Sequence, residues 1–312
     1  GAKEIIYDDE YSAAVAQAKP GLGKLRALGK NPDKEEPSGS TDETLADLLA
    51  RSSGRAHRSK AGSYEVHGGI TPWQLILKLS DGDVSQSGLL LVEGWTFRQV
   101  RQALESHPEL EADTAGLSDA EILARIGASE KHLEGLFFPD TYLFDKRSGA
   151  LAVLKRAYGA MQAQLERTWA ERDPATPLGS PYEALILASI IEKETGRPED
   201  RGLVASVFSN RLRIGMRLQT DPSVIYGLGP DFDGRLRRSH LDTAHPWNPY
   251  TRAGLPPTPI AIPGEAALRA AVNPDKSEFL YFVARGDGSS EFSRNLAEHN
   301  RAVNKFIRNG GG

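Results

Sequence analysis

The 312-residue sequence contains no cysteine, which excludes disulfide bonds, thiolate nucleophiles and cysteine-ligated zinc sites. Its seven histidines show no metal-ligand spacing, and no H-E-x-x-H motif is present. The G-x-S-x-G, P-loop and dinucleotide-binding fingerprints are missing as well. The sequence therefore gives no sign of a metal site, of a nucleotide cofactor or of an esterase-type serine.

Neither sign of charge dominates, because 38 basic side chains face 42 acidic ones and the net charge is −4. We therefore predict no nucleic-acid partner, which usually requires a basic face.

The longest apolar runs, such as Ala184–Ile191, are about eight residues, whereas a membrane span needs about 20. No signal peptide opens the sequence. With Gly1 and Gly310–Gly312 at its ends, we expect a soluble piece of a longer protein.

Length and composition indicate a globular chain with one large and one smaller domain, since 39% of residues are hydrophobic and 26% charged. Residues 1–59 form a poorly defined N-terminal segment or linker, with a helix expected over 41–52. Residues 60–92 form a strand–helix unit, and residues 93–307 form the larger domain. Helices and short strands occur without βαβ alternation, which predicts the α+β class.

Local patterns place the elements of both regions. Alternation predicts a strand at Gly62–Val66, and Thr71 followed by Pro72 predicts a helix start. That helix should bury the stripe Trp73, Leu75, Ile76 and Leu79. In the larger region we predict strands at 88–92 and 279–284, a packed loop or edge strand at 134–142, and long loops over 217–263. The predicted helices there cover 97–106, 119–126, 150–170, 182–195, 198–213 and 293–307.

The helix over 182–195 is apolar nearly all round and ends in two carboxylates, Glu192 and Glu194. Two positions on a helix point about 200° apart, so these side chains cannot share one pocket. Glu192 lies over Ala188 and Ser189, whose small side chains leave room for a ligand. Glu194 lies over two isoleucines, which favours packing. Glu192 is therefore the better candidate for a cleft.

Burial against apolar surface raises a carboxyl pKa and keeps the acid protonated near neutral pH. A general acid that protonates a glycosidic oxygen needs this property. The alternative is an ordinary solvated helix end, with Glu194 pairing at the surface. This segment alone does not decide between them.

Two further segments carry clustered polar groups. Gln219, Thr220 and Asp221 precede Pro222, where Thr220 or Asp221 could also simply cap a short helix. Arg211, Arg213 and Arg217 form a basic stripe, for which a solvated face or ion pairing is the expected role. In the proline-rich stretch 247–264, Asn248 and Tyr250 beside Trp247 would suit a sugar, unless the aromatic rings only cover the core.

Taken together, these segments resemble the YceG-like endolytic transglycosylases of the bacterial cell wall. The resemblance covers roughly residues 60–307, and its most specific part is I-E-K-E-T followed by N-R-L-x-x-G-M-x-L-Q-T-D-P. Ser290 stands where relatives often carry a histidine, and Ile262 where a polar residue is common. The matching stretches are Glu93–Thr96, Glu134–Tyr142, Ala188–Thr195, Val207–Gly227, Asn248–Gly264 and Leu280–Asn300.

The resemblance implies a YceG-like catalytic domain and a small LysM-like subdomain that docks glycan. It implies a membrane-anchored enzyme on the periplasmic side of the inner membrane that acts on peptidoglycan strands near the cell-wall synthases. The anchor itself is absent from this sequence. It also implies that Glu192 is the catalytic residue of a reaction that needs no cofactor. The residues nominated to bind substrate are Ser189, Asn210, Gln219, Thr220, Asp221, Asn248 and Tyr250.

The implied reaction is non-hydrolytic and leaves 1,6-anhydro-muramoyl ends. Two alternatives remain open at this point. One is a muramidase in which Asp221 is the second carboxylate and activates water. The other is a non-catalytic peptidoglycan-binding scaffold for wall synthases. If Glu192 is not the acid, Glu194 is the next candidate.

Overall fold

The computed structural model describes residues 3–7, 62–66, 70–81 and 86–308. The helix predicted at 41–52 lies outside the described residues. The chain divides into two units, of which the first holds the described residues up to Gly88 together with 108–111 and 143–148. The second holds residues 89–107, 112–142 and everything after 148. The LysM-like identity of residues 60–92 stays a prediction.

In the first unit, β1 (Lys3–Tyr7) pairs antiparallel with β2 (Gly62–Val66), and α3 (Pro72–Asp81) follows. The predicted strand and helix start are confirmed: Thr71 Oγ1 accepts from the Gln74 backbone N–H at 3.3 Å. β1 was not predicted, because its residues lay in a segment read as a linker. The expected burial of Trp73 is wrong, since this side chain is 42% exposed while Ile76 and Leu79 are buried.

Short strands and two helices come next along the chain. The predicted helices at 97–106 and 119–126 are confirmed as α4 (Phe97–Glu105) and α5 (Asp119–Ile126), the second capped by Ser118 and closed by a left-handed Gly127. The strand predicted at 88–92 lies two residues earlier. The strands are β3 (Gln86–Leu90) paired with β5 (Thr141–Asp145), and β4 (Leu110–Glu111) paired with β6 (Ser148–Gly149).

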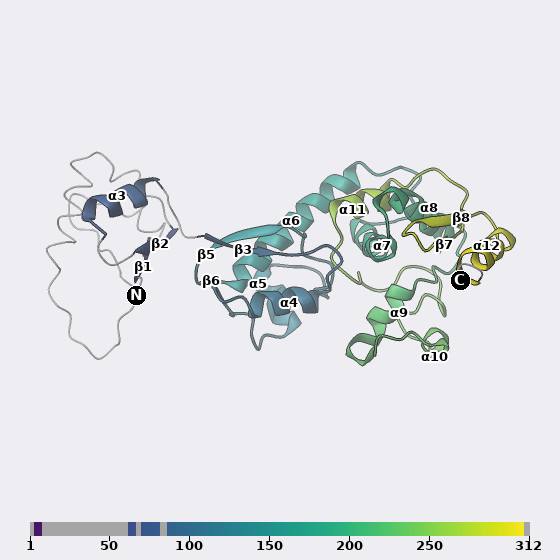
Figure 1. The fold of residues 1–312 in the computed structure, drawn as a ribbon, viewed down its shortest axis with the longest axis horizontal. Helices are drawn as coiled ribbons and strands as arrows, with labels where there is room; N and C mark the ends of the chain where they lie inside the picture. The colour runs from purple at the N-terminus through teal and green to yellow at the C-terminus, as the bar shows by residue number, and fades with distance from the viewer. Residues whose placement is uncertain (1–2, 8–61, 67–69, 82–85, 309–312) are drawn as a thin grey trace. The chain divides into compact units, whose positions relative to one another are not determined.

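The core of the second unit is a group of helices around α7 (Pro181–Glu194) (Figure 1). Ser180 caps α7 by accepting from the Glu183 N–H, and Pro181 occupies its first turn. Every side chain from Ala184 to Ile191 is buried, as the all-round apolar pattern predicted. The helices packed against α7 are α6 (Ala150–Ala170), α8 (Arg201–Arg213), α9 (Asp221–Leu228) and α11 (Glu265–Val272).

The structure also differs from the predicted elements in the region that follows α7. The helix expected over 198–213 is a 3₁₀ turn (Pro198–Asp200) followed by α8, and α11 was not anticipated. The loop region contains α9, a 3₁₀ turn (Gly229–Asp231) and α10 (Arg238–Asp242).

At the C-terminal end, β7 (Tyr281–Ala284) pairs with β8 (Ser290–Ser293). Because Ser293 pairs with Tyr281 in this sheet, the closing helix predicted from 293 starts only at α12 (Leu296–Val303), which continues into a π turn (Asn304–Arg308). The Asn295 side chain caps α12 by accepting from the Glu298 N–H at 3.0 Å. The combination of helices and small sheets confirms the α+β class. None of the helices in the described ranges is long and apolar enough to cross a membrane.

Candidate active site

Glu192, near the C-terminal end of α7, is half-buried and binds the start of another helix. The backbone N–H of Gly264, the N-cap residue of α11, donates to Glu192 Oε2 at 3.1 Å. Burial raises the pKa of Glu192, and the negative charge of Glu93 raises it further. The Gly264 hydrogen bond and the charges of Arg201 and Lys193 oppose the rise in pKa without cancelling it.

The Glu93 side chain, from the turn between β3 and α4, also lies next to Gly264 at the start of α11. A Cβ atom on Gly264 would overlap the Glu93 carboxylate, so any larger residue at this N-cap would displace Glu93 from its present position. The turn is tied to α7 by Lys193 Nζ, which donates to the Gly94 carbonyl at 3.2 Å. Gly94 N–H in turn donates to the Ile262 carbonyl at 2.8 Å. Two carboxylates, Glu93 and Glu192, therefore flank the N-terminus of α11, and the first of them was not predicted as a site residue.

Glu194 belongs to a different cluster, as the 200° divergence along α7 requires. Burial raises its pKa to about 7, and nearby Asp221 contributes to the rise. A hydrogen bond with the Thr220 side chain and the charge of Arg211 lower it. The expectation that Glu194 only packs on its isoleucine neighbours is wrong, since polar groups from three other segments surround it.

Four of the nominated substrate-binding residues lie on the Glu194 side of the helix. The Tyr250 hydroxyl donates to Asp221 Oδ1 at 2.5 Å, and Asp221 opens α9. Thr220 is buried and is bonded to Glu194, and its side chain makes no capping bond to α9. Gln219 has a φ of 53°, a left-handed conformation uncommon outside glycine and enriched at functional sites. The structure thus gathers Gln219, Thr220, Asp221 and Tyr250, but around Glu194 and not around Glu192.

The other three nominated side chains are occupied by the protein itself. Ser189 is fully buried, donates to the Ile186 carbonyl at 2.7 Å and accepts from Ile260 N–H at 3.0 Å. The Asn210 amide donates to two carbonyls in the loop before β7, at 2.9 and 3.0 Å. The Asn248 amide, 1% exposed, donates to the carbonyls of three residues within or just after α10. Their geometry therefore supports a role in holding loops and does not support substrate contact.

The predicted basic stripe is not a uniform solvated face. Arg211 is 6% exposed, and its guanidinium donates to the Leu280 carbonyl at 2.7 Å and the Leu218 carbonyl at 2.6 Å. It also lies over the Tyr281 ring, 5.3 Å from the centroid. Arg213 and Arg217 are exposed, as expected. The burial of Arg211 could not be predicted from the sequence, because the periodicity of apolar residues in a helix does not indicate which charged residue is buried.

A third carboxyl with a perturbed pKa is Glu134, which is 7% exposed. It accepts from Phe97 N–H at 2.9 Å and shares a hydrogen bond with the Tyr226 side chain. Burial raises its pKa to about 7 against these bonds. Next to it, Trp247 Nε1 donates to Thr258 Oγ1 at 2.9 Å and its ring lies against Tyr226. Trp247, which is half-buried, therefore packs on Tyr226 and Thr258, and its contact with a sugar stays a prediction.

Glu134 should make folding stability depend on pH. A carboxyl whose pKa is about 7 when folded and 4.5 when unfolded binds more protons in the folded state between these values. The free energy of unfolding should therefore fall as pH rises from about 4.5 to 7. Glu134→Gln, which keeps an acceptor for Phe97, should flatten this part of the profile in denaturant titrations. An unchanged slope would contradict the prediction, and exposed Glu166→Gln is the control.

Within the described part of the chain, no group of three or more histidine, aspartate and glutamate side chains is placed to hold a metal ion.

A sequence model of the YceG-like family matches residues 34–305, so the chain belongs to this family. The match begins earlier than residue 60, where the resemblance was expected to start. The chain is 32% identical over 272 residues to a Bacillus subtilis (strain 168) protein named endolytic murein transglycosylase, covering 80% of this chain and 73% of that one.

A Streptococcus pneumoniae (strain D39) protein of the same name is 26% identical over 286 residues, and this chain spans only 51% of its length. The crystal structure of a yceG-like protein from Listeria monocytogenes superimposes with a TM-score of 0.56 at 28% identity. The superposition covers 84% of this chain and 90% of that one.

Proposed function

We propose that the chain is an endolytic murein transglycosylase, an enzyme that cuts within peptidoglycan glycan strands, with Glu192 as its acid and base. Family membership and the names of the Bacillus and Streptococcus relatives support the reaction class. The observation that carries the assignment of Glu192 is its position: a half-buried carboxyl of raised pKa at the end of a buried helix, facing a backbone N–H.

In the proposed reaction Glu192 protonates the oxygen that joins N-acetylmuramic acid to N-acetylglucosamine, and the C1–O bond breaks. The resulting carboxylate removes the proton from the C6 hydroxyl of the same muramoyl residue, whose oxygen attacks C1. A 1,6-anhydro ring closes, and Glu192 is protonated again. One acid/base group suffices because the nucleophile is already on the substrate at high effective concentration. The Gly264 N–H stabilises the carboxylate form between the two steps.

The proposal also covers where the enzyme acts and what residues 60–92 bind. Such cuts would terminate nascent strands on the periplasmic side of the inner membrane, where an anchor in the full-length protein would hold the enzyme near the wall synthases. The LysM-like unit would dock glycan. Ring closure needs no water, so excluding water from C1 is the main demand on the site.

The products decide between this proposal and its alternatives. Purified sacculi are digested and the released fragments identified by mass spectrometry. We expect 1,6-anhydro-muramoyl ends. Reducing muramoyl ends would instead show a muramidase, with Asp221 as the first candidate for the second carboxylate. Binding to sacculi without any cleavage would show a scaffold.

Glu93 has a testable role beside Glu192. Its negative charge raises the pKa of Glu192, so Glu93→Gln should lower that pKa. Because the reaction begins with protonated Glu192, the loss of activity at high pH should then occur at a lower pH. A pH profile of kcat measures this shift, and Glu199→Gln, an exposed position seven residues after Glu192 in the sequence, is the control. A profile that falls in rate without moving would indicate that Glu93 only supports the turn.

A further inference from the structure

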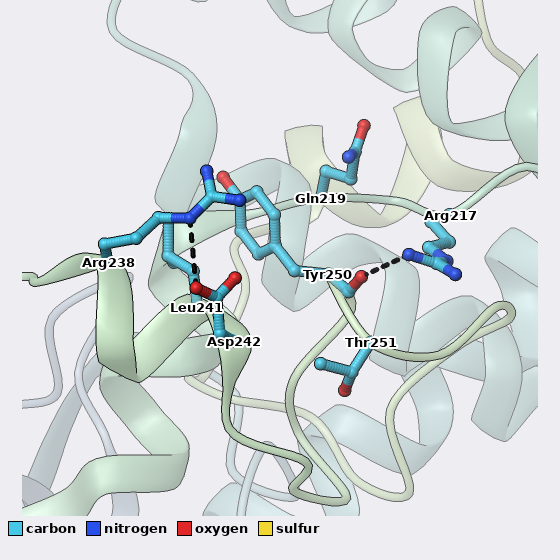
Figure 2. A pocket seen from close by; sticks show the side chains of 7 residues that line it. All are labelled: Arg217, Gln219, Arg238, Leu241, Asp242, Tyr250 and Thr251. Atoms are coloured by element: carbon cyan, nitrogen blue, oxygen red, sulfur yellow. Dashed lines mark hydrogen bonds and ion pairs between the residues drawn. The ribbon is translucent and has the colours of Figure 1, made fainter.

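A pocket of about 480 Å³ lies between α10 and the loop segments that carry Gln219 and Tyr250 (Figure 2). Figure 2 shows Arg217 and Arg238 on opposite sides of Tyr250, with Asp242 below Arg238. Two of the nominated substrate-binding residues, Gln219 and Tyr250, belong to its wall. Its lining residues are Arg217, Gln219, Arg238, Leu241, Asp242, Tyr250 and Thr251.

The pocket carries an excess of positive charge. Arg238 pairs with Asp242 at 3.1 Å, but both side chains are largely exposed, so this pair contributes little and can exchange partners. Arg217 has no carboxylate partner among the residues that the structure describes. One of its nitrogens, Nη1, donates to the Tyr250 carbonyl at 2.8 Å, which fixes the side chain in the wall. Two arginines therefore face one aspartate.

The walls are held by buried groups behind them, so the pocket is preformed. Asn248 ties α10 to the loop and accepts from the Tyr250 N–H at 2.9 Å. Arg211 binds the Leu218 carbonyl next to Gln219, which is fixed in its left-handed conformation. Such strained conformations persist only where the surrounding structure enforces them. A preformed cationic pocket favours binding of an anion of fixed geometry.

The pocket is linked to the reaction site through a short series of contacts. The Tyr250 hydroxyl binds Asp221, and Asp221 lies close enough to Glu194 to raise its pKa. Glu194 is two residues beyond Glu192 on the same helix. These contacts connect the pocket to the end of α7 that carries Glu192, although the pocket and Glu192 lie on different faces of that helix.

We propose that this pocket binds a carboxylate of the peptide stem carried by the muramoyl residue. The inference rests on the proposed function. The sugars of the strand are uncharged, and the stem, which hangs from the same residue whose bond is cut, brings the negative charge. Arg217 supplies the main contact, with Arg238 able to leave Asp242 and assist. Holding the stem would orient the muramoyl ring for cleavage.

Two substrates test the proposal: native glycan strands with their stems, and the same strands after carbodiimide coupling to ammonia, which converts the carboxylates to amides. We expect Arg217→Gln to lower kcat/KM roughly tenfold on native strands, the usual effect of losing a charge-assisted hydrogen bond, and to have no effect on amidated strands. Arg238→Gln should show a smaller loss with the same selectivity. Wild-type protein should lose roughly tenfold on amidation.

Arg252→Gln is the matched control, since it removes the same charge next to Thr251 without lining the pocket. It should behave like wild type on both substrates. Equal losses for Arg217→Gln on native and amidated strands would overturn the carboxylate assignment and leave the proposed function intact. If wild-type protein cleaved neither substrate, both the function and this inference would fail.

Discussion

Glu192→Gln should abolish most of the cleavage of peptidoglycan, lowering kcat by roughly 10²–10⁴-fold, the usual contribution of a general acid–base. The amide has nearly the shape of the carboxyl and still accepts the Gly264 N–H bond, so the fold should be unaffected. It cannot protonate the glycosidic oxygen or remove a proton from the C6 hydroxyl. Anhydro fragments released from sacculi, counted by mass spectrometry against time, measure the loss.

The Glu194→Gln variant tests whether Glu192 or Glu194 is the acid. Glu194 lies on the same helix, and burial raises the pKa of its carboxyl to about 7. We expect a smaller loss, since Glu194 faces Thr220 and Asp221 rather than the Gly264 backbone. Exposed Glu199→Gln should retain full activity. If Glu194→Gln abolished cleavage and Glu192→Gln did not, the acid would be Glu194, and the reaction would take place beside the arginine-lined pocket.

The sequence was sufficient to predict α7 and its two glutamates, because local signals define that helix. An unbroken apolar run predicted a buried helix over 182–195, and the structure adds that Ser180 caps it and Pro181 begins it. Helical geometry alone also predicted that Glu192 and Glu194 face different surroundings. What each one faces could not be predicted, since Gly264 lies 72 positions from Glu192 and only the tertiary fold joins them.

The amide and hydroxyl side chains were the weakest predictions, for a physical reason. A loop over a core must satisfy its own backbone groups, and the side chains best suited to that task are also those best suited to bind sugars. Asn248 is an example: its side chain donates to three backbone carbonyls and accepts from one backbone N–H of the surrounding loop. Composition gave no means of separating it from Gln219, whose side chain lies in a pocket.

The two faces at the end of α7 divide the work of the proposed enzyme. On one face Glu192, Glu93 and the start of α11 provide proton transfer, and on the other Glu194, Asp221 and Tyr250 connect to a preformed cationic pocket. Substitutions on the first face should change kcat and its pH dependence. Substitutions in the pocket should change kcat/KM and depend on the charge of the stem. The two sets of variants therefore report on separate steps.

Arg211→Met should destabilise the fold more than the substitution of an exposed arginine. The Arg211 side chain joins α8 to the segments that contain Leu218 and Leu280. Methionine fills much of the same space but leaves the buried carbonyl of Leu218 and the half-buried carbonyl of Leu280 without donors. Each unsatisfied acceptor costs about 1–3 kcal/mol, so the free energy of unfolding should fall by about 3 kcal/mol or more. The melting temperature should drop by roughly 6–12 °C, measured by circular dichroism.

Arg213→Met, two positions along the same helix, is the control for this prediction. Arg213 is exposed, and its bonds to Asn210 and the Ala175 carbonyl lie at the surface, so its loss should cost at most about 0.5 kcal/mol. Equal effects for the two variants would show that the bonds from Arg211 to Leu218 and Leu280 are not what fixes the Gln219–Thr220 segment. A large loss for Arg211→Met alone, accompanied by weaker binding of native strands, would connect this buried cation to the pocket wall that it supports.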